Sequence, residues 1–468
     1  MLKKIFTNSF GILTSRIFGF VRDLLTASIL GANIYSDIFF VAFKLPNLFR
    51  RIFAEGAFVQ SFLPAYTKAK QKNLFAAAVF VRFFAIIALL SLLVTLFAPF
   101  FTKLIALGFS AELVQKAAPF VAINFYYLLF IFCVTFLAAL LQYKEHFATT
   151  AFSTALLNLT LITALLLYKD ADKETIVLAM SIAVVVGGAL QLAAHLLVAV
   201  AKGIVQRLML GFAALGAKKQ RIEADLANFY KNFLPAIWGN STAQLSAFLD
   251  TWLASFLASG AISYLYYANR VFQLPLALFA IATATALFPS VAKAIKKDDE
   301  NTALTLLNRS FWLLLFLLGA ATLGGIILAH EIVWLLFERG SFTQNDTQNT
   351  ALVLQMYMVG LLFWGLSKLF SLWLYAKHRQ KDAAKIATYA LAANIAFSIA
   401  LIFPLGAAGL ALASSVAGAV QLGLLAKSFG KKRLLALLNN RFAIYVPAAL
   451  SLFGLFLFLL KKVLHAYL

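Results

Sequence analysis

The sequence predicts an all-α polytopic membrane protein, and its composition and apolar runs carry that prediction. Of the 468 residues, 63% are hydrophobic and only 12% are charged, and the mean hydropathy is +0.89. A soluble chain of this size has roughly a quarter charged residues. Apolar runs of about 20 residues, the length that crosses a bilayer as a helix, recur along the whole chain. The runs are continuous rather than alternating, which excludes a transmembrane β-barrel.

These runs define about thirteen transmembrane helices. In chain order, the predicted spans are residues 8–32, 36–64, 75–101, 118–142, 148–168, 175–201, 228–258, 262–290, 306–328, 350–376, 384–403, 406–427 and 442–461. The first, second and eighth spans are less apolar than the others. Their polar residues therefore need a separate explanation.

The segments between the spans alternate in charge. One set is basic, including TKAKQK (67–72), AKHRQKDAAK (376–385) and KSFGKKR (427–433), whereas the other set is short or mixed. Because basic loops stay in the cytoplasm, the alternation predicts a cytoplasmic N-terminus and explains the net charge of +22 without nucleic acid. Thirteen spans place the C-terminus outside, where Lys461 and Lys462 fit the rule poorly.

Residues 203–221 are too polar for a span and too apolar for a free loop. They carry Arg207 and Arg221 among leucines, isoleucine and valine, which is typical of an amphipathic helix lying on the inner leaflet. This segment divides the chain. We expect an N-terminal lobe (1–202), the interfacial linker helix (203–221), a C-terminal lobe (222–430) and an extra C-terminal helix (431–468).

The two lobes resemble each other in sequence. Residues 26–49 and 253–279 both run from an apolar helix through a glycine turn to an aromatic-rich helix that is broken by a Leu-Pro pair, at Pro46 and Pro275. A parallel repeat of this kind is a common transporter architecture, with the substrate path between the repeats. We therefore expect two six-helix lobes around a central cavity.

Charged residues inside the first, second and eighth spans are the strongest functional signal. Each costs about 2.5 to 3.5 kcal/mol in a bilayer unless it faces water or a partner. The cations outnumber the anions, and arginine binds phosphate oxygens bidentately. The residues are Arg16, Arg22, Asp23, Asp37, Lys44, Arg50, Arg51, Glu55 and Arg270. They predict a water-filled, positively charged cavity that binds an anion, with a phosphate group as the preferred anion.

Two simpler interpretations remain open. The charges could form structural pairs, such as Arg22 with Asp37, or reach from span ends to the interface. The chain shows no phosphate loop of the GxxxxGK[ST] type, no histidine pair at metal-ligand spacing and no nucleophile–base pair. We therefore expect no enzymatic activity and no cofactor.

The stretch SRIFGFVRDLLTASILGANIYSDIFFVAFKLPNLFRRIFAEGAFVQSFLPAY (15–66) resembles the MurJ (MviN) family of lipid II flippases, in the multidrug, oligosaccharidyl-lipid and polysaccharide exporter superfamily. Residues 253–275 and 336–347 agree with it. The resemblance implies translocation of undecaprenyl-diphosphate-linked disaccharide-pentapeptide for peptidoglycan synthesis, by alternating access in the bacterial inner membrane. It implies a cationic cavity between the lobes. The substrate-binding residues carried over are Ser15, Arg16, Arg22, Asp37, Arg50 and Arg270, with Lys44, Glu55 and Ser263 beside them.

The chain departs from the family's pattern in places. Asn269 and Gln273 replace acids, which makes the cavity more cationic. Members commonly have fourteen spans, and thirteen are found here. Some members bind sodium, and the matching positions are Asp250, Asn394, Ser398 and Ser414, where Ser398 replaces a carboxylate. Na⁺ and Cl⁻ are the ions that we consider for this chain.

Other functions remain to be weighed. A multidrug exporter of the same superfamily needs an acidic cavity for cationic drugs, and another lipid-linked polysaccharide exporter would share the cationic one. A scaffold that recruits cell-wall synthesis proteins has no need of Arg16 or Arg270 within the membrane. The expected partners are the lipid-linked precursor, membrane lipids and cell-wall synthesis proteins.

Overall fold

The computed structural model describes residues 2–50, 58–218 and 222–467, and within them every regular element is helical. The backbone contacts divide the chain into two compact units, residues 1–256 and 257–468. The all-α prediction is confirmed. The division of the chain into two lobes by a linker at residues 203–221 is inferred from the sequence, and it stays a prediction.

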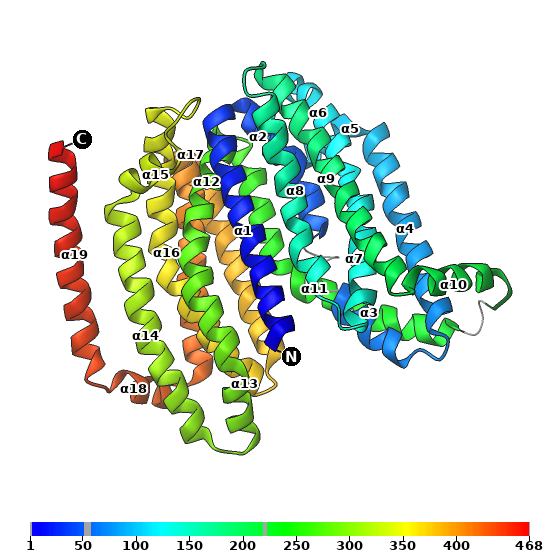
Figure 1. The fold of residues 1–468 in the computed structure, drawn as a ribbon. Helices are drawn as coiled ribbons and strands as arrows, with labels where there is room; N and C mark the ends of the chain where they lie inside the picture. The colour runs from blue at the N-terminus through cyan, green and yellow to red at the C-terminus, as the bar shows by residue number, and fades with distance from the viewer. Residues whose placement is uncertain (1, 51–57, 219–221, 468) are drawn as a thin grey trace. The chain divides into compact units, whose positions relative to one another are not determined.

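The first unit contains the helices up to α11 (Figure 1). They are α1 (Leu2–Leu30), α2 (Ile34–Phe49), α3 (Phe58–Lys68), α4 (Lys72–Leu96), α5 (Ala98–Ile105), α6 (Ala111–Phe125), α7 (Tyr127–Tyr143), α8 (Ala148–Leu167), α9 (Lys173–Ala201), α10 (Ile204–Lys218) and α11 (Glu223–Ala254).

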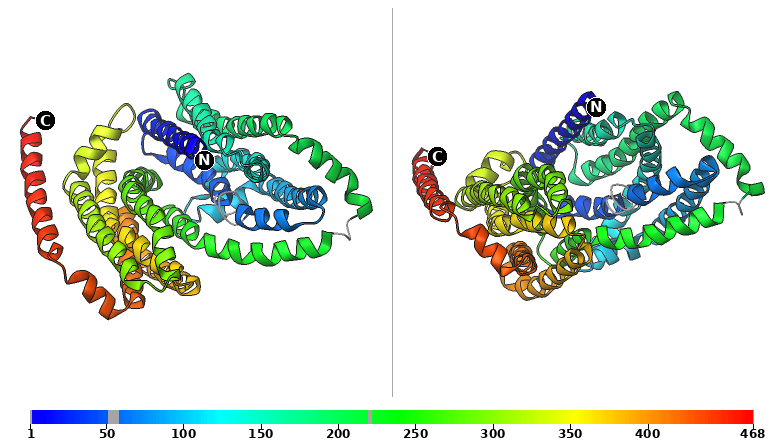
Figure 2. Two further views of the ribbon diagram at one scale, coloured as in Figure 1. Left: turned by 60° about the horizontal axis from the view of Figure 1, so that its bottom comes forward. Right: turned by 90° about the horizontal axis from the view of Figure 1, so that it is seen from below.

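The second unit contains the remaining helices. They are α12 (Ala261–Pro275), the π-helix η3 (Leu276–Ile281), α13 (Ala282–Lys296), α14 (Glu300–Ile327), α15 (Ala329–Phe337), α16 (Gln344–Ala376), α17 (Gln380–Phe429), α18 (Lys431–Leu438) and α19 (Phe442–Tyr467). In Figure 2, α19, drawn in red, runs along the outer side of its own unit.

Nine helices in the described residues are long and apolar enough to cross a membrane. One of them, α17, holds two predicted spans and bends at Gly406, whose φ of 58° and ψ of −137° are not helical. The nine helices cover ten predicted spans. The other three coincide with α1, with α2 and α3, and with α11, where polar residues lower the hydropathy. The thirteen-span pattern thus agrees with the helices.

Small residues bring α1 against α8 in the first unit. A Cβ added at Gly11 would lie 2.8 Å from the Cβ of Ala151, and one added at Gly19 would lie 3.3 Å from the Asn158 amide. Because glycine leaves room for the other helix, the two backbones approach closely. This packing sets where the polar residues of α1 meet those of α8.

The proline-containing spans are not regular helices throughout. After Pro275 the chain winds as the π-helix η3 for six residues before α13 begins, so the predicted break at Pro275 is confirmed. At Pro46, in contrast, α2 continues to Phe49. A π-helical segment inside a span is often found at functional sites.

A short surface helix follows the last span of each six-span set. α10 follows α9, and α18 follows α17. On α10, Ile204 and Leu208 are buried, while Met209 and Leu210 are exposed. The amphipathic helix predicted from residues 203–221 is therefore helical over Ile204–Lys218, and its position on the inner leaflet stays a prediction.

The terminal helix α19 is attached to α14. Leu450 lies against Gly319, and Leu323 lies against Gly454. The Lys461 ammonium donates to the Ile327 carbonyl at 2.8 Å and lies 3.6 Å from a Glu331 carboxylate oxygen. The ion pair with Glu331 explains why Lys461 occurs at this end of α19, although the alternation of basic loops predicts no basic residue there.

Candidate anion-binding site

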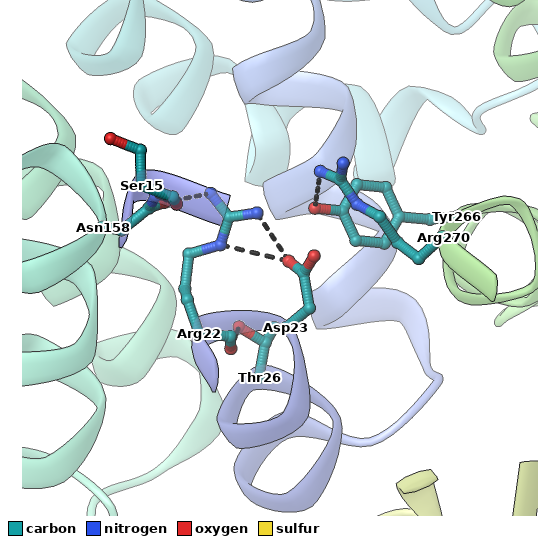
Figure 3. A network of polar contacts seen from close by, with 7 residues as sticks. All are labelled: Ser15, Arg22, Asp23, Thr26, Asn158, Tyr266 and Arg270. Carbon is teal, nitrogen blue, oxygen red and sulfur yellow. Dashed lines mark hydrogen bonds and ion pairs between the residues drawn. The ribbon is translucent and has the colours of Figure 1, made fainter. Parts of the chain in front are cut away.

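Arg22 lies in the middle of α1 and is held by three hydrogen bonds (Figure 3). Its Nη2 and Nε donate to Asp23 Oδ1 at 2.5 and 3.1 Å, and its Nη1 donates to Asn158 Oδ1 at 2.9 Å. Arg22 is 9% exposed and Asp23 is 3% exposed. Arg22 thus forms a structural pair with Asp23, whereas the pair of Arg22 with Asp37 considered from the sequence stays a prediction.

Ser15 and Arg16 differ sharply although they are neighbours. Ser15 is buried and donates its hydroxyl to the Ala151 carbonyl at 2.9 Å, while its own carbonyl accepts from the Asn158 amide. Arg16 is exposed and has no hydrogen bond or ion pair to any described residue. Ser15 therefore contributes to helix packing, and Arg16 is the cation of α1 that is available to a ligand.

The charged residues of α2 follow an ordered N-terminus. Asn33 and Ser36 form a capping box there, which fixes where the helix begins. Asp37, in the first turn, is 2% exposed, and Lys44 is half-buried. A carboxylate near the N-terminus is stabilised by the helix dipole.

Arg50 directly follows α2 and is half-buried. Its Nε and Nη2 donate to the Asn47 side-chain oxygen at 3.2 and 3.0 Å. Arg51 and Glu55, also predicted, lie outside the described residues. Within residues 10–50 there are four cations (Arg16, Arg22, Lys44 and Arg50) and two carboxylates (Asp23 and Asp37), so this part of the first unit has an excess of positive charge.

Arg270 is the corresponding cation of the second unit. Its Nη2 donates to the Tyr266 hydroxyl at 2.7 Å, and its guanidinium carbon lies 4.7 Å from the centre of the Tyr266 ring (Figure 3). Ser263, about two turns before Arg270 on α12, is fully buried. Asn269 and Gln273, which replace acids of the resembling family, hydrogen-bond to each other through their side chains.

The sequence interpretation missed the neutral partners of these cations. Asn158 and Asn47 accept from arginines, and Tyr266 stacks on one. Asn158 stands alone among apolar residues in the run TALLNLTLI. Because a buried amide needs a partner, that isolation was a usable signal that the residue faces a polar group.

The residues considered for sodium divide between the two units. Asp250 belongs to the first unit, and Asn394, Ser398 and Ser414 belong to the second. Asn394 Nδ2 donates to the Ser414 hydroxyl at 3.0 Å. The buried oxygens Asn394 Oδ1 and Ser398 Oγ have no hydrogen-bond partner in the described part of the chain. Such oxygens suit a hard cation.

Comparison with known proteins places these features in a family. A family model described as lipid II flippase MurJ matches residues 26–468. The chain belongs to the MurJ lipid II flippase family. A Helicobacter pylori (strain ATCC 700392 / 26695) protein named probable lipid II flippase MurJ is 48% identical over 452 residues, which cover 94% of this chain and 98% of that one. The Haemophilus influenzae (strain ATCC 51907 / DSM 11121 / KW20 / Rd) protein of the same name is 32% identical over 441 residues, covering 90% and 84%.

Solved structures agree with the family. A structure titled lipid II flippase MurJ, inward closed conformation, aligns over 98% of both chains with a TM-score of 0.78 and 25% identity. An inward-facing multidrug resistance MATE family transporter of the MOP superfamily aligns over 91% of this chain and 96% of its own, with a TM-score of 0.65 and 13% identity. The second likeness concerns the fold alone.

Proposed function

We propose that this protein is a lipid II flippase, which moves an undecaprenyl-diphosphate-linked peptidoglycan precursor from the inner to the outer leaflet. Membership of the MurJ family supports the proposal. The structural observation that carries it is the availability of Arg16. This cation lies on α1, which coincides with the first predicted span, is exposed and has no partner in the described residues.

The chemistry of the head group accounts for the choice of arginines. A diphosphate carries several oxygens that a guanidinium binds through paired, charge-assisted hydrogen bonds. Arg16 and Arg270 are the guanidiniums that we propose for this role. Arg22 is already neutralised by Asp23, so its proposed role is to hold Asn158 of α8 against α1. The lipid tail would remain in the bilayer.

Transport by alternating access requires no covalent step, and we assign the chain no catalytic residue. We further propose a bacterial inner-membrane location with a cytoplasmic N-terminus. The alternation of basic loops supports that orientation. Cell-wall synthesis proteins are proposed partners, through the basic segments around α10 and α18.

A bound Na⁺ would add a positive charge to the chain. Asn394, Ser398 and Ser414 would hold it with their oxygens. The unsatisfied oxygens of Asn394 and Ser398 support this assignment.

Multidrug export of cationic compounds is the alternative of the same superfamily. It is disfavoured because the positions available for acids on α12 are Asn269 and Gln273, which pair with each other and carry no charge. A scaffold function leaves the exposed cation of α1 without a purpose. Neither alternative explains an intramembrane cationic excess.

The test is native mass spectrometry of the purified protein with the diphosphate lipid precursor and a cationic drug as competitor. Arg16→Ala and Arg270→Ala should each lose most of the bound lipid, whereas Arg309→Ala, which removes an exposed cation from α14, should bind as the wild type does. Displacement of the lipid by the drug, or equal binding by all variants, would rule the proposal out.

A further inference from the structure

A cavity within the first unit is lined by polar residues that the cationic site does not use. Its volume is about 340 Å³, which is within the range of small-molecule sites. It is bounded by α3, α7, α8 and α9, with Arg50 at one side. The polar lining residues are Thr135, Gln142, Thr150, Ser153, Thr154 and Gln191. We call it the threonine–glutamine cavity.

The spacing of these residues gives each helix one polar face. Thr135 and Gln142 are seven residues apart on α7, and Thr150 and Thr154 are four apart on α8. Residues at such spacings share a helix face. Because polar groups within an apolar span are costly unless they meet a partner or a water-filled space, two facing polar surfaces around one cavity require an explanation.

Some of the lining is already fixed by hydrogen bonds inside the unit. The Gln191 amide donates to the Ser153 carbonyl at 3.0 Å, and its oxygen accepts from the Tyr127 hydroxyl at 3.2 Å. His195 Nδ1 lies 2.8 Å from the Gln191 carbonyl. A carbonyl can only accept, so Nδ1 carries the hydrogen and Nε2 accepts from Thr150, 3.4 Å away. This network holds the far wall of the cavity in place.

Other lining groups keep unused hydrogen-bonding capacity. Thr135 donates to the Ile131 carbonyl at 2.7 Å, the usual bond of a helical threonine, and its oxygen can still accept. The side chains of Thr154 and Gln142 make no hydrogen bond to any described residue. These two side chains offer a hydroxyl, an amide donor and an amide acceptor to whatever occupies the cavity.

The charge of the residues that line the cavity limits which kinds of ligand it can bind. Among the residues that line the cavity, Arg50 is the charged one, and none is a carboxylate. A cation is therefore a poor ligand for this cavity. A free anion would bind Arg50 but would make no use of the hydroxyl and amide groups. A neutral group rich in hydroxyls and amides, joined to an anion, would bind both Arg50 and these polar side chains. An amide-substituted sugar attached to a phosphate has this composition.

We propose that the threonine–glutamine cavity binds the amide-substituted sugar next to the diphosphate of the lipid-linked substrate, while Arg50 binds the adjoining phosphate. This inference rests on the proposed function, since it assumes a diphosphate lipid as substrate. It adds a subsite that selects for the sugar. Thr154 and Gln142 supply the hydrogen bonds of that selection.

Binding of three lipids separates the sugar from the other parts of the substrate. The probes are undecaprenyl diphosphate, undecaprenyl diphosphate carrying an N-acetylated sugar without peptide, and the complete precursor. The variant is Thr154→Val, which keeps the shape and removes the hydroxyl. The control is Thr163→Val on the same helix, where the hydroxyl is exposed and donates to the Leu159 carbonyl at 2.9 Å.

We expect Thr154→Val to bind both sugar-bearing lipids about tenfold more weakly, the effect of losing one hydrogen bond to a polar ligand. Its affinity for undecaprenyl diphosphate and its melting midpoint should match those of Thr163→Val. Gln142→Leu should show the same selective loss. Arg50→Ala should weaken all three lipids, because they share the diphosphate.

Three results would overturn the assignment. Equal binding of the sugar-bearing lipids by Thr154→Val and Thr163→Val would mean that the cavity does not contact the sugar. A loss confined to the complete precursor would place the peptide there instead, and an equal loss for all three lipids would place the diphosphate there. Failure of the wild type to bind any of the lipids would refute the proposed function itself, and is distinguishable from all three.

Discussion

Glu145, in the first unit, and His378, in the second, occupy the same position in one type of turn, which Asp298 also adopts. Each follows a lysine that ends a helix, and each has a φ of 56°, in the left-handed region that favours glycine. The next residue donates back five positions in both turns, from His146 to Leu141 at 2.9 Å and from Arg379 to Leu374 at 2.8 Å. This is the Schellman pattern of a helix C-terminus. Glu145 lies between the fourth and fifth predicted spans and His378 between the tenth and eleventh, so this turn recurs after six spans, in agreement with the repeat noted near Pro46 and Pro275.

The strain at this position predicts a stabilising substitution. His378 is exposed, and a side chain in the left-handed region costs about 1 kcal/mol relative to glycine. His378→Gly should therefore unfold at a higher temperature than His378→Ala, which retains a Cβ and lacks the imidazole. The comparison is made by thermal unfolding in detergent, and an Ala variant at least as stable as the Gly variant would show that the turn is unstrained.

Much of this fold could be predicted from the sequence, since uninterrupted apolar runs specify membrane helices almost by themselves. The break at Pro275 could be predicted from its proline, whereas an interruption without a proline could not. Phe97 separates α4 from α5 just before Pro99, but Tyr126 separates α6 from α7 with no proline or glycine beside it, because packing against neighbours decides such an interruption. The hydrogen-bond partners of Arg22 could not be predicted from the sequence either. Helical spacing separates adjacent side chains, but the long Arg22 side chain reaches Asp23 and, on α8, Asn158.

The buried pair on α1 should be far more important for stability than an exposed pair. Asp23→Asn leaves Arg22 charged and buried, and removal of one partner of such a pair typically costs about 3 kcal/mol. The control is Asp382→Asn, whose carboxylate lies 2.6 Å from Arg379 with about half of each side chain exposed; it should cost under about 1 kcal/mol. Unfolding by heat or denaturant in detergent measures both. Equal losses would show that Arg22 finds another counter-charge.

Attachment of α19 should depend on Lys461 and not on its neighbour. Lys461 caps the end of α14 and pairs with Glu331, which is 11% exposed as a side chain. Lys461→Met should raise hydrogen exchange in residues 442–463 about tenfold, as expected for loss of a favourable cation at a helix C-terminus. Lys462, whose ammonium lies 5.1 Å from the centre of the Phe458 ring on its own helix, provides the control. Similar exchange in Lys461→Met and Lys462→Met would mean that apolar contacts alone hold α19.

The turn between α7 and α8 should make stability depend on pH near neutrality. Burial, and secondarily the Lys202 ammonium, lowers the pKa of His146 from its ordinary 6.5. Because the folded-state pKa is below the unfolded one, the folded protein binds the proton less readily. The contribution is complete above pH 6.5 and is lost as the pH falls toward the folded-state pKa.

Acidification from pH 7.5 to 5.5 should therefore lower the melting midpoint of the wild type more than that of His146→Gln. His330→Gln, at a half-buried histidine of α15, controls for general effects of the substitution. A wild-type midpoint that falls no further than that of His146→Gln would contradict the assignment.

The π-helix after Pro275 has a geometric consequence for its whole span. An α-helix advances by about 100° per residue, and a π-helical turn contains one residue more than an α-helical turn. Residues 276–281 therefore shift the phase of α13 relative to α12. Residues spaced at multiples of 3.6 from Arg270 therefore stop lying on one helix face after Pro275. Deleting one residue there would turn every side chain of α13 by about 100° around the helix axis, so this segment sets which residues of α13 are aligned with Arg270.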